Sequence, residues 1–263
     1  MSEDILLRED IGHVAFLTMN SPKNLNALSD TMLAALMAAF DRLESDANIR
    51  AVVIRGAGKA FCAGHDLKEM QAARQAPDGG REYFLDLFKR CSAMMLRLQS
   101  LPQPVIAQVH GIATAAGCQM VASCDLAVAA DDTRFGVNGV NIGLFCSTPM
   151  VALTRNIPRK AAFEMLTTGH FISAERAAGL GLINKAVPEA LLAAETESLA
   201  TTIAAKLDTA VKIGKRAFYE QIGMPTESAY EYAGQVMVEN MLERDTDEGI
   251  TAFLEKRPPD WQE

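Results

Sequence analysis

Residues 58–70 read Gly-Lys-Ala-Phe-Cys-Ala-Gly-His-Asp-Leu-Lys-Glu-Met, directly after a β-branched apolar run, 50–54, that predicts a buried strand. The small residues and Gly64 permit a tight turn and a close approach of the backbone to a ligand. A helix is expected to begin near Asp66, and the unpaired amides at a helix start point toward whatever lies in front of them. The segment therefore predicts a strand–turn–helix unit, whose turn is either purely structural or faces a ligand.

A second segment, Val109 to Met120, has the same order of an apolar strand, a small-residue turn and a helix that reaches about Cys124. Two such units in one domain can direct two backbone amides at one carbonyl oxygen. Donors of this kind stabilise the negative charge that develops on the oxygen, and losing one typically costs ~10²–10³-fold in rate. A thioester enolate would suit such a site.

The rest of the chain predicts an α/β domain with mostly parallel strands, followed by helices. Strands are expected at 13–19, 104–109 and 126–129, and helices at 30–43 and 83–98. Beyond Thr148 the pattern becomes helical, with helices expected at 160–167, 173–178 and 188–207. The predicted division is a core over residues 1–200 with the ligand site and a C-terminal helical region over 201–263, which could pack on its own domain or on neighbouring subunits.

Composition limits the classes of function. The net charge of −8 argues against nucleic-acid binding, and no apolar run is long enough to predict a membrane span. The five cysteines lack Cys-x-x-Cys spacing and the four histidines are dispersed, so no metal site is expected. Scattered cysteines predict free thiols in a reducing compartment, and the acidic start lacks the features of a leader, so we expect a cytoplasmic protein.

Four segments together resemble the enoyl-CoA hydratase/isomerase (crotonase) family: 24–28, 58–67, 110–118 and 248–257. The turns at 64–67 and 113–119, taken with Gly143 to Pro149, resemble the subgroup called enoyl-CoA hydratase domain-containing protein 3. This resemblance implies an α/β crotonase (ClpP-like) spiral of strand–strand–helix units with a C-terminal helical trimerisation region. It also implies an acyl-CoA ligand from fatty-acid metabolism, no separate cofactor, and a homotrimer or a hexamer built as a dimer of trimers.

The resemblance implies roles for particular residues. The oxyanion-hole amides map to His65 and Ala116, the latter a position that is usually Gly in the family. The backbone near Ala27 and Ala63 would contact the adenine, and Lys68 the pantetheine or phosphates. Lys256 would contact a phosphate, on its own or a neighbouring subunit. The implied substrate-binding or CoA-binding positions are Ala27, Ala63, His65, Asp66, Leu67, Lys68, Ala116 and Lys256.

Both catalytic Glu positions of the family are changed, to Gln119 and Gly139. Gln exchanges no proton near neutral pH and Gly has no side chain, whereas general acid–base catalysis is usually worth ~10²–10⁴-fold. We therefore expect a weak or altered hydratase, and restoring both Glu should raise hydration. The alternatives are a non-catalytic acyl-CoA binding or regulatory protein and an isomerase-type reaction. The His65 and Cys146 side chains are further candidates, although a backbone role and a structural role, respectively, are favoured.

Overall fold

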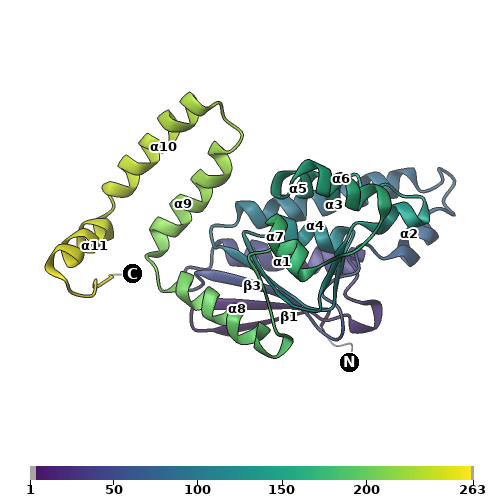
Figure 1. The fold of residues 1–263 in the computed structure, drawn as a ribbon, viewed down its shortest axis with the longest axis horizontal. Coiled ribbons are helices and arrows are strands. Elements are labelled where there is room, and N and C mark those ends of the chain that lie inside the picture. Colours follow the sequence, from purple (N-terminus) through teal and green to yellow (C-terminus); the bar gives the residue numbers. More distant parts are fainter. Residues whose placement is uncertain (1–3, 262–263) are drawn as a thin grey trace.

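The computed structural model describes residues 4–261, and a six-stranded sheet forms its centre (Figure 1). The strand order is β1-β2-β3-β4-β6-β9, and every neighbouring pair is parallel except β1 with β2. The strands are β1 (Leu6–Ile11), β2 (Val14–Met19), β3 (Ala51–Gly56), β4 (Val105–Val109), β6 (Leu126–Ala130) and β9 (Lys185–Val187). A second, smaller sheet contains β5 (Ile112–Thr114), β7 (Arg134–Gly136) and β8 (Ile172–Ser173).

Helices cover both faces of the larger sheet, which explains why its central strands are apolar throughout. Side chains alternate between the faces of a strand. In β3, Val52 and Ile54 enter the main core, whereas Ala51 and Val53 pack with Ala200 in the layer beneath α8. The helices are α1 (Asp30–Glu44), α2 (Leu67–Ala73), α3 (Arg81–Ser100), α4 (Ala116–Ser123), α5 (Pro149–Asn156), α6 (Arg159–Thr168), α7 (Ala174–Leu180) and α8 (Glu189–Ala204), with 3₁₀ turns η1 (Pro22–Asn24) and η2 (Asn138–Ile142).

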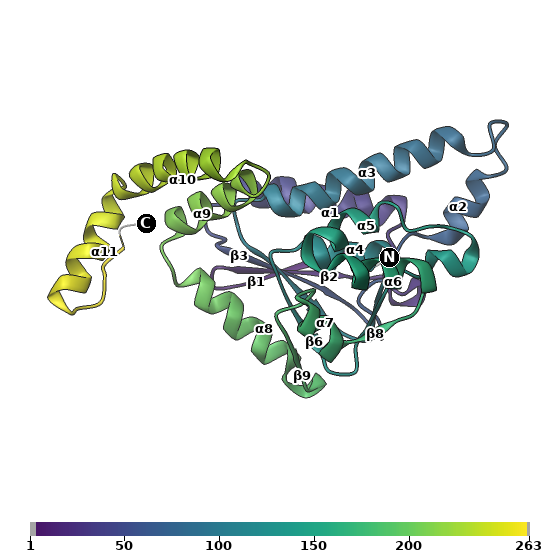
Figure 2. The same cartoon turned by 45° about the horizontal axis from the view of Figure 1, so that its top comes forward.

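The last three helices form an arm that extends away from the sheet (Figures 1 and 2). They are α9 (Asp208–Gln221), α10 (Thr226–Met241) and α11 (Arg244–Glu255). A buried ammonium fastens α9 to the core, because Lys215 Nζ donates to Asp125 Oδ2 at 2.6 Å and to two backbone carbonyls. Tyr219 donates to the other Asp125 oxygen at 2.8 Å. Burial lowers the pKa of Lys215, and the nearby Asp125 carboxylate opposes this shift.

The expected strands and helices are present in the expected order, but strands β5, β7, β8 and β9 and helix α5 were not expected, and some boundaries differ. Strand β1 was not expected, because its Arg8-Glu9-Asp10 sequence is polar; as an edge strand it needs little burial. Helix α8 starts after Pro188, and the division expected at residue 200 falls inside it. Of the helices between residues 4 and 261, none has the length and apolar composition that a bilayer crossing requires.

Candidate functional site

Two turns that are far apart in the sequence lie against each other near the start of α4. The backbone of residues 62–64 is hydrogen-bonded on both sides: Leu28 N–H donates to Gly64 O at 2.7 Å, and Thr114 N–H donates to Cys62 O at 3.0 Å. Gly64 has a φ of +91°, and a Cβ there would lie 2.9 Å from Ala115 Cβ and 3.3 Å from the Ala116 nitrogen. Only glycine therefore allows the first turn to approach α4 so closely.

A buried asparagine holds the first turn from behind. The Asn26 side-chain oxygen accepts from Ser21 N–H at 2.9 Å, and its amide nitrogen donates to Ala57 O and Ala60 O at 2.9 and 2.8 Å. These bonds tie the segment before α1 to the turn that carries His65. Sequence reasoning noted Asn26 only as part of a family resemblance, because nothing in one sequence indicates which carbonyls a buried amide will reach.

The two turns form one wall of a cavity of about 430 Å³. His65, Ala116 and Gly139 all line this cavity, as do Ala63 and Leu67. Neither the His65 amide nor the Ala116 amide donates a hydrogen bond to another group within residues 4–261. Phe88 and Thr114 also line the cavity, and the sequence alone did not indicate either residue as a site position. With Cys146, the cavity therefore brings together six of the predicted or candidate positions, among them the two with unpaired amides, in a largely apolar lining.

The residue before the second amide has a positive φ. Ala116 is the first residue of α4, whereas Ala115 before it has φ 49° and ψ −118°. An alanine in this region is strained, at an order of about 1–3 kcal/mol. Its amide donates to Gly136 O at 2.9 Å, which helps to hold the conformation. The strained turn orients the start of α4, and with it the Ala116 amide.

The His65 ring packs into an apolar setting. It stacks edge-on against Phe88, with 5.7 Å between ring centroids, and its Nδ1 lies 3.5 Å from Leu28 O. Its Nε2 is buried without a hydrogen-bond partner among the described residues. Burial lowers the pKa of His65, and the contact with Leu28 O only partly opposes this. The ring is therefore neutral at pH values above its ordinary pKa of 6.5.

The other wall of the cavity folds back onto Gly139. Leu144 N–H donates to Gly139 O at 2.9 Å, which closes the loop. A Cβ at Gly139 would lie 2.5 Å from Leu144 O and 2.8 Å from Cys146 Sγ. The Cys146 thiol thus lies where a side chain at 139 would begin. Burial raises the pKa of Cys146, so this thiol stays protonated near neutral pH.

Gln119, the other changed position, lines a different cavity of about 260 Å³. Its side chain is 4% exposed, and its Oε1 has no hydrogen-bond partner in the described part of the chain. The sequence had suggested that positions 119 and 139 face one reaction centre. In this structure they line separate cavities, and Thr148 is the residue that contacts both.

The remaining predicted positions lie outside the cavity. Asp66 caps α2 by accepting from Lys68 N–H at 2.8 Å, and the Lys68 side chain is exposed. Ala27 is buried beside the first turn. Lys256 ends α11, which Figure 1 places at the opposite end of the molecule from α2. Within residues 4–261, no group of three or more His, Cys, Asp or Glu side chains is arranged to hold a metal ion.

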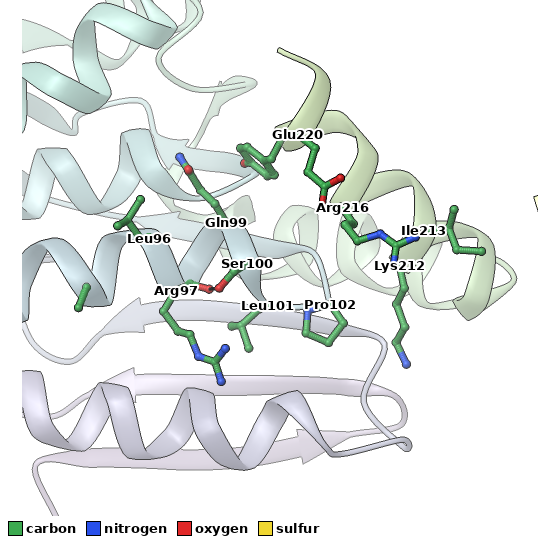
Figure 3. Close-up of a pocket in the computed structure, with 12 residues that line it drawn as sticks. Leu96, Arg97, Gln99, Ser100, Leu101, Pro102, Lys212, Ile213, Arg216 and Glu220 are labelled. Atoms are coloured by element: carbon green, nitrogen blue, oxygen red, sulfur yellow. Dashed lines mark hydrogen bonds between the residues drawn. The ribbon is translucent and has the colours of Figure 1, made fainter. Parts of the chain in front are cut away.

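A larger groove of about 770 Å³ lies elsewhere, between α3 and the arm helix α9 (Figure 3). Leu96, Leu101 and Pro102 line one side, and Ile213 and Arg216 the other. None of its lining residues is a predicted site residue. Its size reflects the way the arm leaves the core, so we place the candidate site in the smaller cavity, which both residues with unpaired amides line.

Comparison with known proteins now decides the family. The family model described as enoyl-CoA hydratase/isomerase matches residues 9–263. The chain belongs to the enoyl-CoA hydratase/isomerase family. A human relative, enoyl-CoA hydratase domain-containing protein 3, mitochondrial, is 46% identical over 93% of this chain and 79% of its own length. A putative enoyl-CoA hydratase of Thermus thermophilus is 34% identical over 97% of this chain and 99% of its own.

Solved structures of enoyl-CoA hydratase/isomerase proteins have the same fold. The crystal structure of an enoyl-CoA hydratase from Mycobacterium smegmatis superposes with a TM-score of 0.95 at 56% identity, covering 99% of this chain and 100% of that one. The crystal structure of human enoyl-CoA hydratase domain-containing protein 3 superposes with a TM-score of 0.94 at 44% identity. The match covers 98% of this chain and 100% of that one. The recognition of this family and of its crotonase-type α/β fold is therefore confirmed.

The expected cytoplasmic location is wrong. The relatives from Xenopus laevis, human and mouse are all named mitochondrial, which points to mitochondria. The expectation rested on the lack of a leader at the start of the sequence and on free thiols. The first residues of a given sequence do not decide a compartment, and free thiols are compatible with any reducing one.

Proposed function

We propose that this protein binds an acyl-CoA thioester in the 430 Å³ cavity, with its carbonyl oxygen between the His65 and Ala116 amides. One observation carries the proposal: both amides belong to residues that line the same cavity, and neither has a partner in the described chain. Two preorganised donors polarise the thioester and stabilise an enolate that forms at its α-carbon. Membership of the enoyl-CoA hydratase/isomerase family supports this ligand class.

The proposed protein is at most a weak hydratase. No Asp or Glu is among the described residues that line the cavity, and its titratable side chains are His65 and Cys146. Burial lowers the pKa of His65 and raises that of Cys146, so the neutral form of each is favoured: the thiol is no base, and the imidazole is a weaker base than usual. Tight binding with slow turnover is therefore favoured over efficient hydration, and an isomerase-type reaction would meet the same lack of a carboxylate base.

Two measurements test this function together. Loss of the conjugated thioester of crotonyl-CoA reports hydration, and calorimetric titration with octanoyl-CoA reports binding. We expect binding in the micromolar range or tighter, with a hydration rate near background. Rapid hydration would overturn the weak-hydratase part of the proposal, and absence of binding to either thioester would overturn the ligand class.

A proline substitution tests the amide itself. Ala116→Pro deletes one N–H at the first position of α4, where proline fits a helix. We expect the affinity for octanoyl-CoA to fall about tenfold, since ~1.4 kcal/mol corresponds to tenfold. Glu189→Pro is the matched control, because it deletes the equivalent N–H of α8 on the other side of the sheet. Unchanged affinity in a folded Ala116→Pro variant would rule out this donor.

We also propose that copies of the chain assemble through the arm, as a trimer or a dimer of trimers. Large apolar side chains at the end of α10 and on α11 are unusually exposed: Leu242, which follows α10, and Phe253 are each 82% exposed, and Leu254 is 74% exposed. Apolar patches of this kind mark contact surfaces. Assembly would bring Lys256 near a neighbour's CoA phosphates, which one chain alone does not allow. Light scattering should give a mass three or six times 28.4 kDa, and a monomer would contradict the proposal.

A further inference from the structure

The cavity of the proposed acyl-CoA site supplies donors for an enolate but no carboxylate to form one. The His65 and Ala116 amides can hold the thioester oxygen, yet no Asp or Glu is among the described residues that line the cavity. Removal of a proton from an α-carbon ordinarily requires a positioned base. The site therefore suits a ligand whose enolate forms in solution, without a base from the protein.

A 3-oxoacyl thioester has this property. Its α-carbon lies between two carbonyl groups, so the negative charge left by proton loss is shared by two oxygens and the proton passes readily to the buffer. Such an enolate presents two acceptors, one at the thioester and one at the third carbon. A site that selects it needs a further donor beside the two amides.

Asn138 provides that donor. Strands β5 and β7 are parallel and end with Thr114 opposite Gly136. Ala116 and Asn138 each follow this pair by two residues, and both line the cavity. The Thr114 hydroxyl donates to Asn138 Oδ1 at 2.6 Å. This bond occupies the amide oxygen and leaves the nitrogen, Nδ2, as the group that Asn138 offers to a ligand.

The Asn138 nitrogen is accessible as well as unpaired. It makes no hydrogen bond within residues 4–261, and the side chain is only partly buried. The unpartnered atoms that are closed to solvent include Gln119 Oε1 and His65 Nε2 but not Asn138 Nδ2. A ligand in the cavity can therefore reach this nitrogen, whereas it cannot reach those two atoms.

Asn138 lies near the reacting carbons of an acyl group rather than near its distal end. The next residue, Gly139, is a position where the family resemblance implies a group that acts on those carbons, and it lines the same cavity. A 3-oxo oxygen is only two carbons away from the thioester carbonyl. One ligand can therefore contact the two amides and the Asn138 nitrogen together.

Charge also favours an enolate. Helix α4 begins at Ala116, and the start of a helix stabilises nearby negative charge. The described lining residues include no Asp or Glu that would repel an anion. A carboxylate at Gly139 would repel such a ligand, so the lack of a side chain there is consistent with binding an anion.

We propose that the cavity binds a 3-oxoacyl-CoA as its enolate, with the thioester oxygen on the His65 and Ala116 amides and the 3-oxo oxygen on Asn138 Nδ2. This proposal rests on the acyl-CoA function proposed above and names the substrate class of that site. The α-proton goes to the buffer before binding, and no covalent bond forms between ligand and protein. Asn138 is then a specificity-determining residue.

Calorimetric titration with three CoA thioesters of equal length tests the proposal on the intact protein. The probes are octanoyl-CoA, 3-hydroxyoctanoyl-CoA and 3-oxooctanoyl-CoA. Near neutral pH, we expect the 3-oxo thioester to bind about three- to tenfold tighter than octanoyl-CoA, because a hydrogen bond to a charged group favours it and the small fraction of enolate in solution offsets part of that gain. The 3-hydroxy thioester should bind more weakly than the 3-oxo thioester, and the reverse order would overturn the assignment.

The near-ultraviolet absorption of the 1,3-dicarbonyl enolate reports which form is bound. We expect this band to grow when the protein is added to 3-oxooctanoyl-CoA at constant pH. Tight binding without growth of the band would mean that the neutral 3-oxo form binds, and would overturn the enolate assignment.

Asn138→Asp keeps an oxygen for the Thr114 hydroxyl and replaces the donor nitrogen with a charged oxygen. The preference for the 3-oxo thioester and the growth of the band should both disappear. Asn138→Ala removes the donor without adding charge and should also lose the preference, so it replaces the Asp variant if that variant does not fold. Asn141→Asp is the matched control, because it places the same charge on the same 3₁₀ turn at an exposed position. An equal loss in Asn141→Asp would show that net charge, rather than the Asn138 donor, sets the preference.

Equal affinities of octanoyl-CoA and 3-oxooctanoyl-CoA in the wild type, or a preference that survives Asn138→Ala, would overturn the inference. If none of the three thioesters binds, the proposed function fails, and that outcome is distinct from octanoyl-CoA binding without any 3-oxo preference.

Discussion

The two walls of the 430 Å³ cavity are built in different ways. The wall of His65 and Ala116 consists of backbone, held by hydrogen bonds and by glycines that allow close approach. The opposite wall, from Gly139 to Cys146, is a loop folded onto a position where a side chain is missing. A main-chain N–H remains when its residue is replaced by any residue except proline, whereas a single substitution removes a side-chain carboxylate. A site built from main-chain donors can therefore keep those donors when the side chains around it change.

The largest effect is expected on the backbone wall, from Gly117→Ala. The new Cβ would overlap the carbonyl oxygen of Cys62, a backbone atom that cannot move without shifting the first turn. We expect the free energy of unfolding to fall by about 3 kcal/mol or more, with loss of acyl-CoA binding. Urea unfolding and calorimetry measure both. Gly179→Ala is the control, since a Cβ there meets open space in α7, and it should stabilise by up to ~1 kcal/mol.

A smaller effect is expected on the opposite wall, from Gly139→Glu combined with Gln119→Glu. The sequence alone suggested that this pair would restore hydration, but a Cβ at 139 would lie 2.5 Å from Leu144 O. We now expect no gain in crotonyl-CoA hydration over Gln119→Glu alone, and a destabilisation of about 1–3 kcal/mol. Adding Cys146→Ala should recover only part of the stability, because the contact with Leu144 O remains. A clear gain in hydration would show that this loop is more adaptable than its packing indicates.

The smallest effect concerns the pH dependence of stability through His65. Burial lowers the pKa of His65 in the folded protein below its ordinary value of 6.5, so the unfolded chain takes up more protons as pH falls. The folded state should therefore lose stability as pH falls below 6.5, until the lower folded-state pKa is passed. Relative to His65→Phe, the wild type should lose on the order of 1 kcal/mol or less between about pH 7 and pH 5. If the stability difference between the wild type and His65→Phe, measured by thermal melting, were the same at pH 7 and pH 5, this burial effect would be contradicted.

Much of the fold follows from local patterns. Ser29 precedes the apolar-periodic run of α1, where an N-cap residue is favoured, and its hydroxyl accepts from Met32 N–H. The run Ala51-Val52-Val53-Ile54 predicted a strand buried on both faces, as β3 is. Strand β1 escaped prediction because an edge strand depends on its pairing partner more than on its own apolar content. The length of α8 was overestimated because helix ends depend on caps and packing that periodicity does not encode.

Less of the site could be predicted. The two turns were identified because a strand, a small-residue turn and a helix start are local features. That a side chain at Gly139 would meet Cys146, and that Gln119 lines a separate cavity, depends on how α3, α4, α5 and the 139–146 loop pack. No spacing along the chain encodes those contacts, because they join segments that only the complete fold brings together.

The sequence by itself determined the family and much of the order of strands and helices, and it predicted that two acidic positions of the family are replaced, since residue identity and hydrophobic period are local properties. The tertiary structure decided that the unpaired amides of His65 and Ala116 share a cavity. It also decided that the two replaced positions do not. Which residues line one cavity depends on long-range packing, because a shift of a few ångströms between distant segments can open a cavity or fill it.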